Sequence, residues 1–302
     1  MRLKKRDFLC LGALTPAEAA DVFVLARAMK HEPKGARLGA LAGRSIAIVL
    51  EKASTRTRVS FEVGAAQLGA HPVVIPMQGS QLMRGEPVQD TARVLAGYSD
   101  MIIYRTSERS RLEEMATANV PVVNALSDDG HPVQVLCDIF TIEEALRAPI
   151  RNLRVSFVGD CASNMARSWV EAAGVFGFAL KLAAPEGYMP PEAALALGNG
   201  NVTLTHDPSA AGVDVDVVNT DVWASMGQED EATERFSALT GFTVDEAMLR
   251  KSPNAIVLHC LPAHRGEEID EATLEGPRSR VWVQAENRLH VQKALMLWLL
   301  TR

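Results

Sequence analysis

The segment SIAIVLEKASTRTRVSFEVGAAQL, residues 45–68, decides the fold. Its apolar, β-branched start, Ser45–Leu50, predicts a buried strand, and Thr55–Leu68 then shows a helical pattern. The polar residues between them include Ser and Thr side chains, which suit the N-cap of a helix. A strand that leads through a short polar loop into a helix indicates a βαβ unit and therefore a mainly parallel sheet.

The same alternation continues on both sides of this segment. Further strands are predicted at Pro72–Pro76, Met101–Tyr104, Val120–Asn124, Arg154–Val158, Ala179–Ala183, Val202–Thr205, Val215–Asn219, Ala255–Leu258 and Val281–Val283. Further helices are predicted at Asp90–Tyr98, Arg109–Ala118, Pro132–Leu146, Asn164–Phe176, Pro191–Leu197 and Asn287–Leu300. We therefore expect an α/β protein with two doubly wound domains, each built on a mainly parallel sheet.

The stretch RAPIRNL, residues 147–153, is the predicted seam between the two domains. We expect a first domain at 1–148, a second at 149–285, and a C-terminal helix at 286–302 that packs back on the first domain. Near the other end, Thr15-Pro16-Ala17-Glu18 predicts a helix start with proline in its first turn. We interpret the residues before it as a mature N-terminus rather than a signal or transit peptide.

Composition excludes several classes of function. The 302 residues are 47% hydrophobic and 23% charged, so a large core fits beneath an ordinary surface. A net charge of -6 argues against nucleic-acid binding, and no segment approaches the roughly 20 apolar residues that span a membrane. The four cysteines are far apart and form no CxxC pair, which favours reduced thiols, no zinc site and a cytoplasmic protein.

The loop after the first strand predicts an anion site. In Ser54-Thr55-Arg56-Thr57-Arg58, hydroxyl and guanidinium groups accompany the start of a helix, whose free N–H groups suit a phosphate. The alternative is an ordinary capped helix with surface arginines, but capping needs only one of these residues. Arg105, His131 and Gln134 follow other predicted strands and are expected at the same edge of the sheet.

These motifs resemble those of the aspartate and ornithine carbamoyltransferase family. Residues 51–62 are similar to its carbamoyl-phosphate signature, 131–134 to its His-Pro-x-Gln motif, and 85–95 to the stretch after its mobile loop. In the second half, Asp221–Gly227 resembles the Asp-x-x-x-Ser-Met-Gly motif of the branch that uses ornithine. Residues 259–262 resemble the His-Cys-Leu-Pro motif of that branch, and 286–288 match the segment before its last helix. The likeness runs in order from near Leu11 to the C-terminus.

The resemblance implies transfer of a carbamoyl group from carbamoyl phosphate to the δ-amine of L-ornithine, giving L-citrulline and phosphate in arginine metabolism. Its implied catalytic residues are Arg105, His131 and Cys260. Its implied carbamoyl-phosphate contacts are Ser54, Thr55, Arg56, Thr57, Gln81, Arg105, His131, Gln134, Cys260, Leu261 and Arg288. Its implied ornithine contacts are Asn164, Asp221, Ser225 and Met226. It also implies a homotrimer or an assembly of trimers with active sites between subunits, Gln81 reaching a neighbouring subunit, and no metal or organic cofactor.

Other interpretations stay open for single residues. By itself Cys260 would be a small buried apolar residue, Met226 a core filler, and Asp221 a helix cap. Glu51 and Glu62 are interpreted as structural partners of nearby Arg and Lys side chains. For the whole chain, the alternatives are a carbamoyltransferase for another amine acceptor, such as aspartate, putrescine or an acylated ornithine, and a non-catalytic binding relative. A dinucleotide enzyme is disfavoured because the loop 159–164 lacks GxGxxG.

Overall fold

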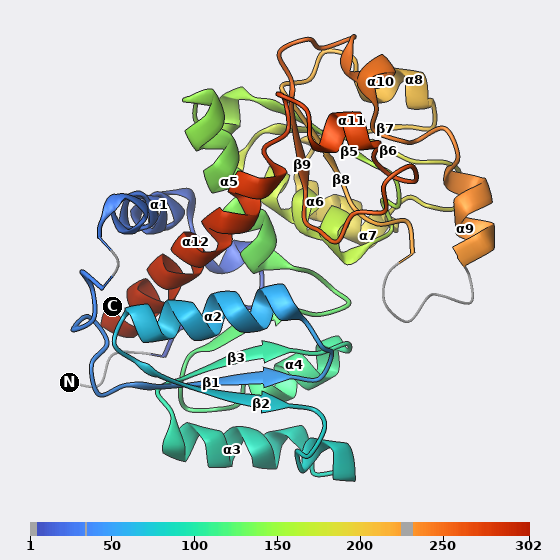
Figure 1. Ribbon diagram of the computed structural model, residues 1–302. Helices are drawn as coiled ribbons and strands as arrows, with labels where there is room; N and C mark the ends of the chain where they lie inside the picture. The colour runs from blue at the N-terminus through green and yellow to red at the C-terminus, as the bar shows by residue number, and fades with distance from the viewer. Residues whose placement is uncertain (1–4, 34, 225–231) are drawn as a thin grey trace. The chain divides into compact units, whose positions relative to one another are not determined.

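The computed structural model describes residues 5–33, 35–224 and 232–302 (Figure 1). The chain forms two compact units. Unit 1 comprises Met1–Cys137 and Asn287–Arg302, and unit 2 comprises Asp138–Glu286. The predicted domain boundary after residue 148 is not tested by this division and stays a prediction.

A four-stranded parallel sheet forms the centre of unit 1. Its strands are β1 (Ser45–Leu50), β2 (His71–Pro76), β3 (Met101–Arg105) and β4 (Val122–Leu126), in the order β2-β1-β3-β4. All neighbouring pairs run parallel, so the carboxyl ends of the strands lie along one edge of the sheet. The predicted first strand is therefore confirmed, and so is the parallel α/β class for this unit.

Helices cover both faces of this sheet. The helix α2 (Thr55–Gln67) lies on one face and α3 (Val88–Tyr98) on the other (Figure 1). The remaining helical elements are α1 (Pro16–His31), α4 (Arg109–Met115), the start of α5 (Pro132–Leu146), the end of α12 (Val281–Thr301) and the 3-10 turns η1 (Leu11–Ala13) and η2 (Leu82–Arg84). The predicted start of α1 is confirmed because Thr15 and Glu18 form a reciprocal capping box.

The end of α12 packs against α2 within unit 1. A methyl group added at Gly64 would lie 3.2 Å from Lys293 Cγ and from Met296 Cε, so the two helices are in close contact there. In addition, Lys293 Nζ donates a hydrogen bond of 2.9 Å to Gln67 Oε1. The expectation that the C-terminal helix returns to the first half of the chain is therefore confirmed.

Unit 2 contains a five-stranded parallel sheet. Its strands are β5 (Arg154–Val158), β6 (Ala179–Ala183), β7 (Val202–Thr205), β8 (Val217–Thr220) and β9 (Ile256–His259), in the order β7-β6-β5-β8-β9. The first strand lies inside the sheet and the chain winds outward from it in both directions, which is doubly wound topology. The accompanying helices are η3 (Ile150–Asn152), α6 (Asn164–Phe176), α7 (Glu192–Leu195), η4 (Ala196–Gly198), α8 (Pro208–Ala211), α9 (Ala232–Leu239), α10 (Glu246–Leu249) and α11 (Glu271–Leu274).

The strand predicted at Val281–Val283 is wrong. These residues form the first turn of α12. The sheet pairing belongs to the residues just before them, because Val257 N donates to Arg278 O and Arg280 N donates to Val257 O. Two β-branched residues beside a tryptophan resemble a strand locally, but their partner on β9 is already occupied. The chain then turns, with Val281 N donating 3.3 Å to Ser279 Oγ, and continues as a helix.

Among the described residues, no helix combines the length and apolarity needed to cross a membrane. All four cysteines are free thiols, and two of them, Cys137 and Cys161, are buried.

Candidate active site

The start of α2 forms the centre of the polar cluster in unit 1. Ser54 is the N-cap residue, and its Oγ accepts a 3.3 Å hydrogen bond from Thr57 N, as the sequence predicted. Ser54 Oγ also donates to Thr57 Oγ1 at 3.0 Å, and Thr57 is fully buried. Such a cap leaves other N–H groups of the first turn available, together with the positive end of the helix dipole. This arrangement is suited to an anion.

Two arginines far apart in sequence meet at the hydroxyl group of Thr57. Arg105 Nη1 donates to Thr57 Oγ1 at 3.3 Å, and Arg288 Nη2 donates to the same oxygen at 3.2 Å. Arg105 ends β3, while Arg288 lies on α12 and is only 4% exposed. Two guanidinium groups that share one neutral acceptor make a concentrated positive field, which favours an anion with several oxygens.

His131 belongs to the same cluster, and Gln134 follows it by three residues, with its main-chain N–H donating to His131 O at 3.0 Å. His131 precedes the first residue of α5 and Gln134 lies in its first turn; both are buried. Burial, followed by the positive charges of Arg288 and Arg105, holds the pKa of His131 well below its usual value. The imidazole is therefore neutral near pH 7 and can donate one hydrogen bond without adding a third positive charge. The predicted convergence of Arg105 and His131 with the Ser54 loop is thus confirmed.

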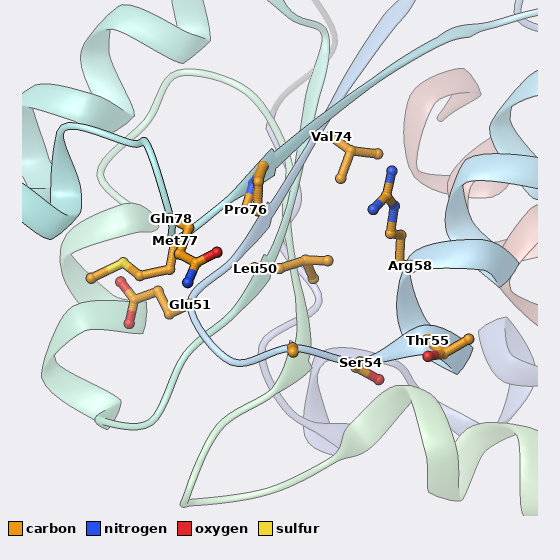
Figure 2. A pocket seen from close by; sticks show the side chains of 10 residues that line it. Leu50, Glu51, Ser54, Thr55, Arg58, Val74, Pro76, Met77 and Gln78 are labelled. Carbon is orange, nitrogen blue, oxygen red and sulfur yellow. The ribbon is translucent and has the colours of Figure 1, made fainter.

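A cavity of about 440 Å³ lies beside this cluster (Figure 2). Its polar wall includes Ser54, Thr55 and Arg58 at the start of α2, and its apolar wall comes from the ends of β1 and β2. The lining residues are Leu50, Glu51, Ala53, Ser54, Thr55, Arg58, Val74, Pro76, Met77 and Gln78. Arg58 was not among the predicted site residues, although it is the last residue of the motif that predicted the anion site.

The remaining predicted residues of unit 1 are more exposed. Thr55 is exposed and Arg56 half-buried in the first turn of α2. Gln81 is exposed before η2, in a different loop. The two glutamates interpreted as structural partners do pair with arginines: Glu51 with Arg111 and Glu62 with Arg58, at 2.6 and 3.3 Å.

A second polar cluster forms in unit 2, after β8 and β9. Cys260 Sγ donates to Asp221 Oδ1 at 2.9 Å, and Val222 N donates to the same oxygen at 2.8 Å. Asp221 is partly buried, and desolvation of its carboxyl group raises its pKa, although the nearby His259 and the thiol hydrogen bond act to lower it. The thiol therefore lies against a carboxylate rather than in an apolar core, which disfavours the bland interpretation of Cys260.

The neighbouring histidine holds the chain around this thiol. Leu261 N donates to His259 Nδ1 at 2.9 Å, so the ring proton is on Nε2, which lies 2.9 Å from Glu268 Oε1. Both side chains of the His259–Glu268 pair are fully buried. Leu261 adopts a positive φ of 59°. This strained backbone is fixed by the hydrogen bond to His259, which sets the position of the Leu261 backbone and of the adjoining Cys260.

These groups are also close enough to be considered as metal ligands. Asp221, His259 and Cys260 each place one ligand atom within 4.8 Å of the others, as do His264, Glu267 and Glu268. The first three groups already bond to one another or to Glu268 and Leu261, so we interpret them as a hydrogen-bond network.

Asn164 lies at the same edge of the sheet of unit 2. It opens α6, whose N-cap residue Ser163 accepts a 3.3 Å hydrogen bond from Ala166 N. Since β5, β8 and β9 are adjacent and in register at Val158, Thr220 and His259, the loops that follow them start side by side. Asn164, Asp221 and Cys260 are therefore gathered in one region of unit 2.

Ser225 and Met226, the other two predicted ornithine contacts, lie outside the described residues. The segments flanking them are anchored by Arg235, which the sequence analysis did not single out. Arg235 Nη1 donates to Asp160 Oδ2 at 2.7 Å and to Trp223 O at 3.2 Å. A single arginine on a short polar helix carries no signal in the sequence that would have identified this role.

Comparison with known proteins finds the same family along nearly the whole chain. Residues 6–144 match the family described as aspartate/ornithine carbamoyltransferase, carbamoyl-P binding domain, and 151–299 match its Asp/Orn binding domain. An ornithine carbamoyltransferase of Sorangium cellulosum is 67% identical and covers 99% of this chain and 98% of its own. Among solved structures, ornithine carbamoyltransferase from Pyrococcus furiosus has a TM-score of 0.89, 42% identity and coverage of 98% and 97%. The anabolic ornithine carbamoyltransferase from Campylobacter jejuni has a TM-score of 0.90, 36% identity and coverage of 97% and 98%.

Proposed function

The chain belongs to the aspartate/ornithine carbamoyltransferase family, and we propose that it transfers the carbamoyl group of carbamoyl phosphate to the δ-amine of L-ornithine. The products are L-citrulline and phosphate. The observation that carries this assignment is 67% identity to an ornithine carbamoyltransferase over 99% of the chain. The reaction is a step of arginine biosynthesis, and the likeness to an anabolic relative supports this direction.

The phosphate group binds at the start of α2 in this proposal. Ser54, Thr55, Arg56 and Thr57 supply hydroxyl, backbone and guanidinium donors, and Arg105 and Arg288 already meet at Thr57. As the bond to the carbamoyl carbon breaks, the departing phosphate gains negative charge. Preorganised donors and a helix N-terminus stabilise this charge without rearranging, which is the largest contribution available to such a reaction.

The carbamoyl end is bound by Arg105, His131 and Gln134. When the amine attacks, the carbonyl oxygen becomes negative, and Arg105 and His131 donate hydrogen bonds to it. The lowered pKa of His131 supports this role, because the neutral imidazole keeps one N–H group that donates a hydrogen bond to the oxygen. Carbamoyl phosphate is already an activated acyl compound, so no covalent enzyme intermediate is required.

Ornithine is bound in unit 2, by Asn164, Asp221, Ser225 and Met226. The δ-amine must be neutral to attack, and an alkylamine of this kind has a pKa near 10.4. Because the Cys260 thiol donates a hydrogen bond to Asp221, its sulfur lone pairs are left to accept a hydrogen bond from the amine and orient it. Asp221 binds the α-amino group, and its negative charge disfavours acceptors with an extra carboxylate, such as aspartate. Cys260 and Leu261 are also proposed to contact carbamoyl phosphate, and the hydrogen bond from Leu261 N to His259 fixes the backbone of Leu261.

We further propose that the chain works as a homotrimer, or a larger assembly of trimers, in the cytoplasm. The exposed position of Gln81 supports a role in a neighbouring subunit, since an exposed amide can reach another chain. The four free cysteines support a reducing compartment. Sedimentation of the purified protein checks the assembly, and a monomer at working concentration would contradict it.

The deciding experiment measures carbamoylation of four acceptors by the purified protein. Ornithine, aspartate, putrescine and N-acetylornithine are each supplied with carbamoyl phosphate, and the products are quantified. We expect citrulline and at most traces of the other products. Turnover of another acceptor in preference to ornithine would overturn the assignment of the Asp221 loop. A folded protein inactive with every acceptor would instead support the non-catalytic alternative.

A further inference from the structure

Glu51 contacts the residues on both sides of Arg105. It is the first residue after β1, and its main-chain N–H donates to Arg105 O at 2.9 Å. Its carboxylate accepts a hydrogen bond from Tyr104 Oη and another, of 2.6 Å, from Thr106 Oγ1. A single side chain thus fixes the residue before Arg105 and the residue after it.

This arrangement determines where Arg105 points. Tyr104 and Thr106 both donate to the Glu51 carboxylate, so they lie on one side of the chain, and Arg105 between them points to the other side. The register pairs Leu50 with Arg105, which places Arg105 on the face opposite to Glu51. That is the side on which Arg105 reaches Thr57 at the start of α2. Holding its two neighbours therefore keeps Arg105 directed at the phosphate site.

The Glu51 carboxylate is itself held by an arginine on α4. Arg111 Nη2 donates to Glu51 Oε1 at 2.6 Å, and Arg111 Nε lies 3.0 and 3.1 Å from the two carboxylate oxygens. The glutamate side chain is only 9% exposed. Burial alone would raise the pKa of Glu51, but the hydrogen bonds from Arg111, Thr106 and Tyr104 outweigh it and lower the pKa. Glu51 is therefore an anion at neutral pH.

An anion at this place would normally oppose phosphate binding. Glu51 lines the same cavity as Ser54, Thr55 and Arg58. In Figure 2 its side chain extends away from these three residues. The pairing with Arg111 holds it in that direction and neutralises its charge, so the cavity keeps its attraction for an anion.

We propose that Glu51 and Arg111 are a positioning pair for the phosphate site: Glu51 directs Arg105 by holding Tyr104 and Thr106, and Arg111 neutralises Glu51. This inference rests on the proposed function, because it concerns the binding and reaction of carbamoyl phosphate. Its two parts make different demands on the two residues. Orientation of Arg105 needs the Glu51 carboxylate, whereas Arg111 is needed only while that carboxylate is charged.

The test compares E51Q, R111M and the double variant E51Q/R111M. For E51Q we expect kcat/KM for carbamoyl phosphate to fall on the order of 10- to 100-fold, with the KM for ornithine unchanged. For R111M we expect weaker binding of inorganic phosphate, measured by calorimetry, because an unpaired anion then lines the cavity. In the double variant phosphate binding should recover in part relative to R111M, while kcat/KM for carbamoyl phosphate stays low because Arg105 is still misdirected.

A matched control is R109M. Arg109 lies on the same helix and pairs with Glu113 and Asp129, but its side chain is 61% exposed and it does not contact Glu51. It should behave as wild type in every assay. Y104F and T106V each remove one hydrogen bond without changing charge, and they serve if E51Q fails to fold. Both should lower kcat/KM for carbamoyl phosphate and leave the KM for ornithine unchanged.

The outcomes separate this inference from the proposed function. If wild type makes citrulline and E51Q, or the pair Y104F and T106V, matches it, the inference is overturned. A double variant that binds phosphate no better than R111M would overturn the neutralising role of Arg111. If wild type binds carbamoyl phosphate but carbamoylates no acceptor, and E51Q weakens that binding, the inference stands and the proposed function fails. A wild type that does not bind carbamoyl phosphate would refute both.

Discussion

Replacing Arg235 with methionine is expected to destabilise unit 2 and weaken ornithine binding together. The Arg235 guanidinium donates to Asp160 and to the carbonyl of Trp223, at 2.7 and 3.2 Å. Asp160 belongs to the loop that leads to Asn164, and Trp223 follows Asp221 by two residues. The substitution therefore frees both segments that carry the proposed ornithine contacts.

The size of the effect follows from the burial of the pair. The side chains of Arg235 and Asp160 are 14% and 9% exposed, so methionine leaves a nearly buried carboxylate without its cation. Breaking a buried ion pair in this way costs about 3–5 kcal/mol. Asp160 keeps a 3.0 Å hydrogen bond from Ala162 N, so we expect the lower limit. About 3 kcal/mol lowers the Tm of a domain of this size by about 6–12 °C, and we expect the KM for ornithine to rise about tenfold.

The assay pairs thermal unfolding with steady-state kinetics for both substrates. The KM for carbamoyl phosphate should not change, because Asp160 and Trp223, to which Arg235 donates, are not among the residues proposed to bind it. The double variant D160N/R235M removes the stranded charge and should recover about 1–2 kcal/mol of stability, but not the affinity for ornithine. R250M, which alters an exposed arginine of unit 2, is the control. If R235M had the same Tm as the control and the same KM for ornithine as wild type, the reasoning from the buried pair would be refuted.

Four further changes test other parts of the structure. Glu18 has its pKa lowered from 4.5 to about 2, chiefly by the hydrogen bond from Arg6; this stability is present above about pH 4.5 and lost as the pH falls towards 2. With an exposed partner, E18Q should cost about 1–2 kcal/mol at pH 7 and little near pH 2, by urea unfolding. A raised or equal stability of E18Q at pH 7 would contradict this. Because the pKa of His131 is lowered in the folded protein, unfolding takes up a proton below pH 6.5, and the free energy of unfolding decreases as the pH is lowered through that range. H131N should make this decrease shallower; a pH dependence as steep as that of wild type would count against it. In C260S the pH profile of kcat should shift because the thiol that contacts Asp221 is gone, and an unchanged profile would remove the thiol from the mechanism. T57V should weaken phosphate binding on the order of tenfold by calorimetry, since two guanidinium groups lose their common acceptor, whereas binding equal to wild type would argue against the proposed phosphate site.

Local chemistry made part of the structure predictable. The strand Ser45–Leu50 and the cap at Ser54 depend on residues adjacent in sequence, and both are confirmed. The strand prediction at Val281–Val283 was wrong because it used only three adjacent residues. Such a short pattern cannot show that Arg278 and Arg280 already pair with the edge of β9.

Long-range pairing set the limit for the site. That Arg288 would meet Thr57 could be expected only from the resemblance to a family, because 231 positions separate them. Glu51 was expected to pair with some nearby arginine, but which one depends on how β3 and α4 fold against β1. Arg235 gave no signal, since its importance comes from two partners that the chain brings to it only on folding.

The interrupted course of unit 1 along the chain determines the order in which the protein can be completed during synthesis. Unit 2, Asp138–Glu286, is continuous in the chain, so its last residue is synthesised before the segment Asn287–Arg302 that completes unit 1. Domains commonly fold as they emerge, from the N-terminus onward, yet here the later unit has all its residues first. Because Arg288 is supplied by that last segment, a nascent chain that stops short of it has no complete phosphate site. A chain that ends before Arg288 lacks one of the two guanidinium groups that meet at Thr57, and we expect it to bind phosphate more weakly than the full chain.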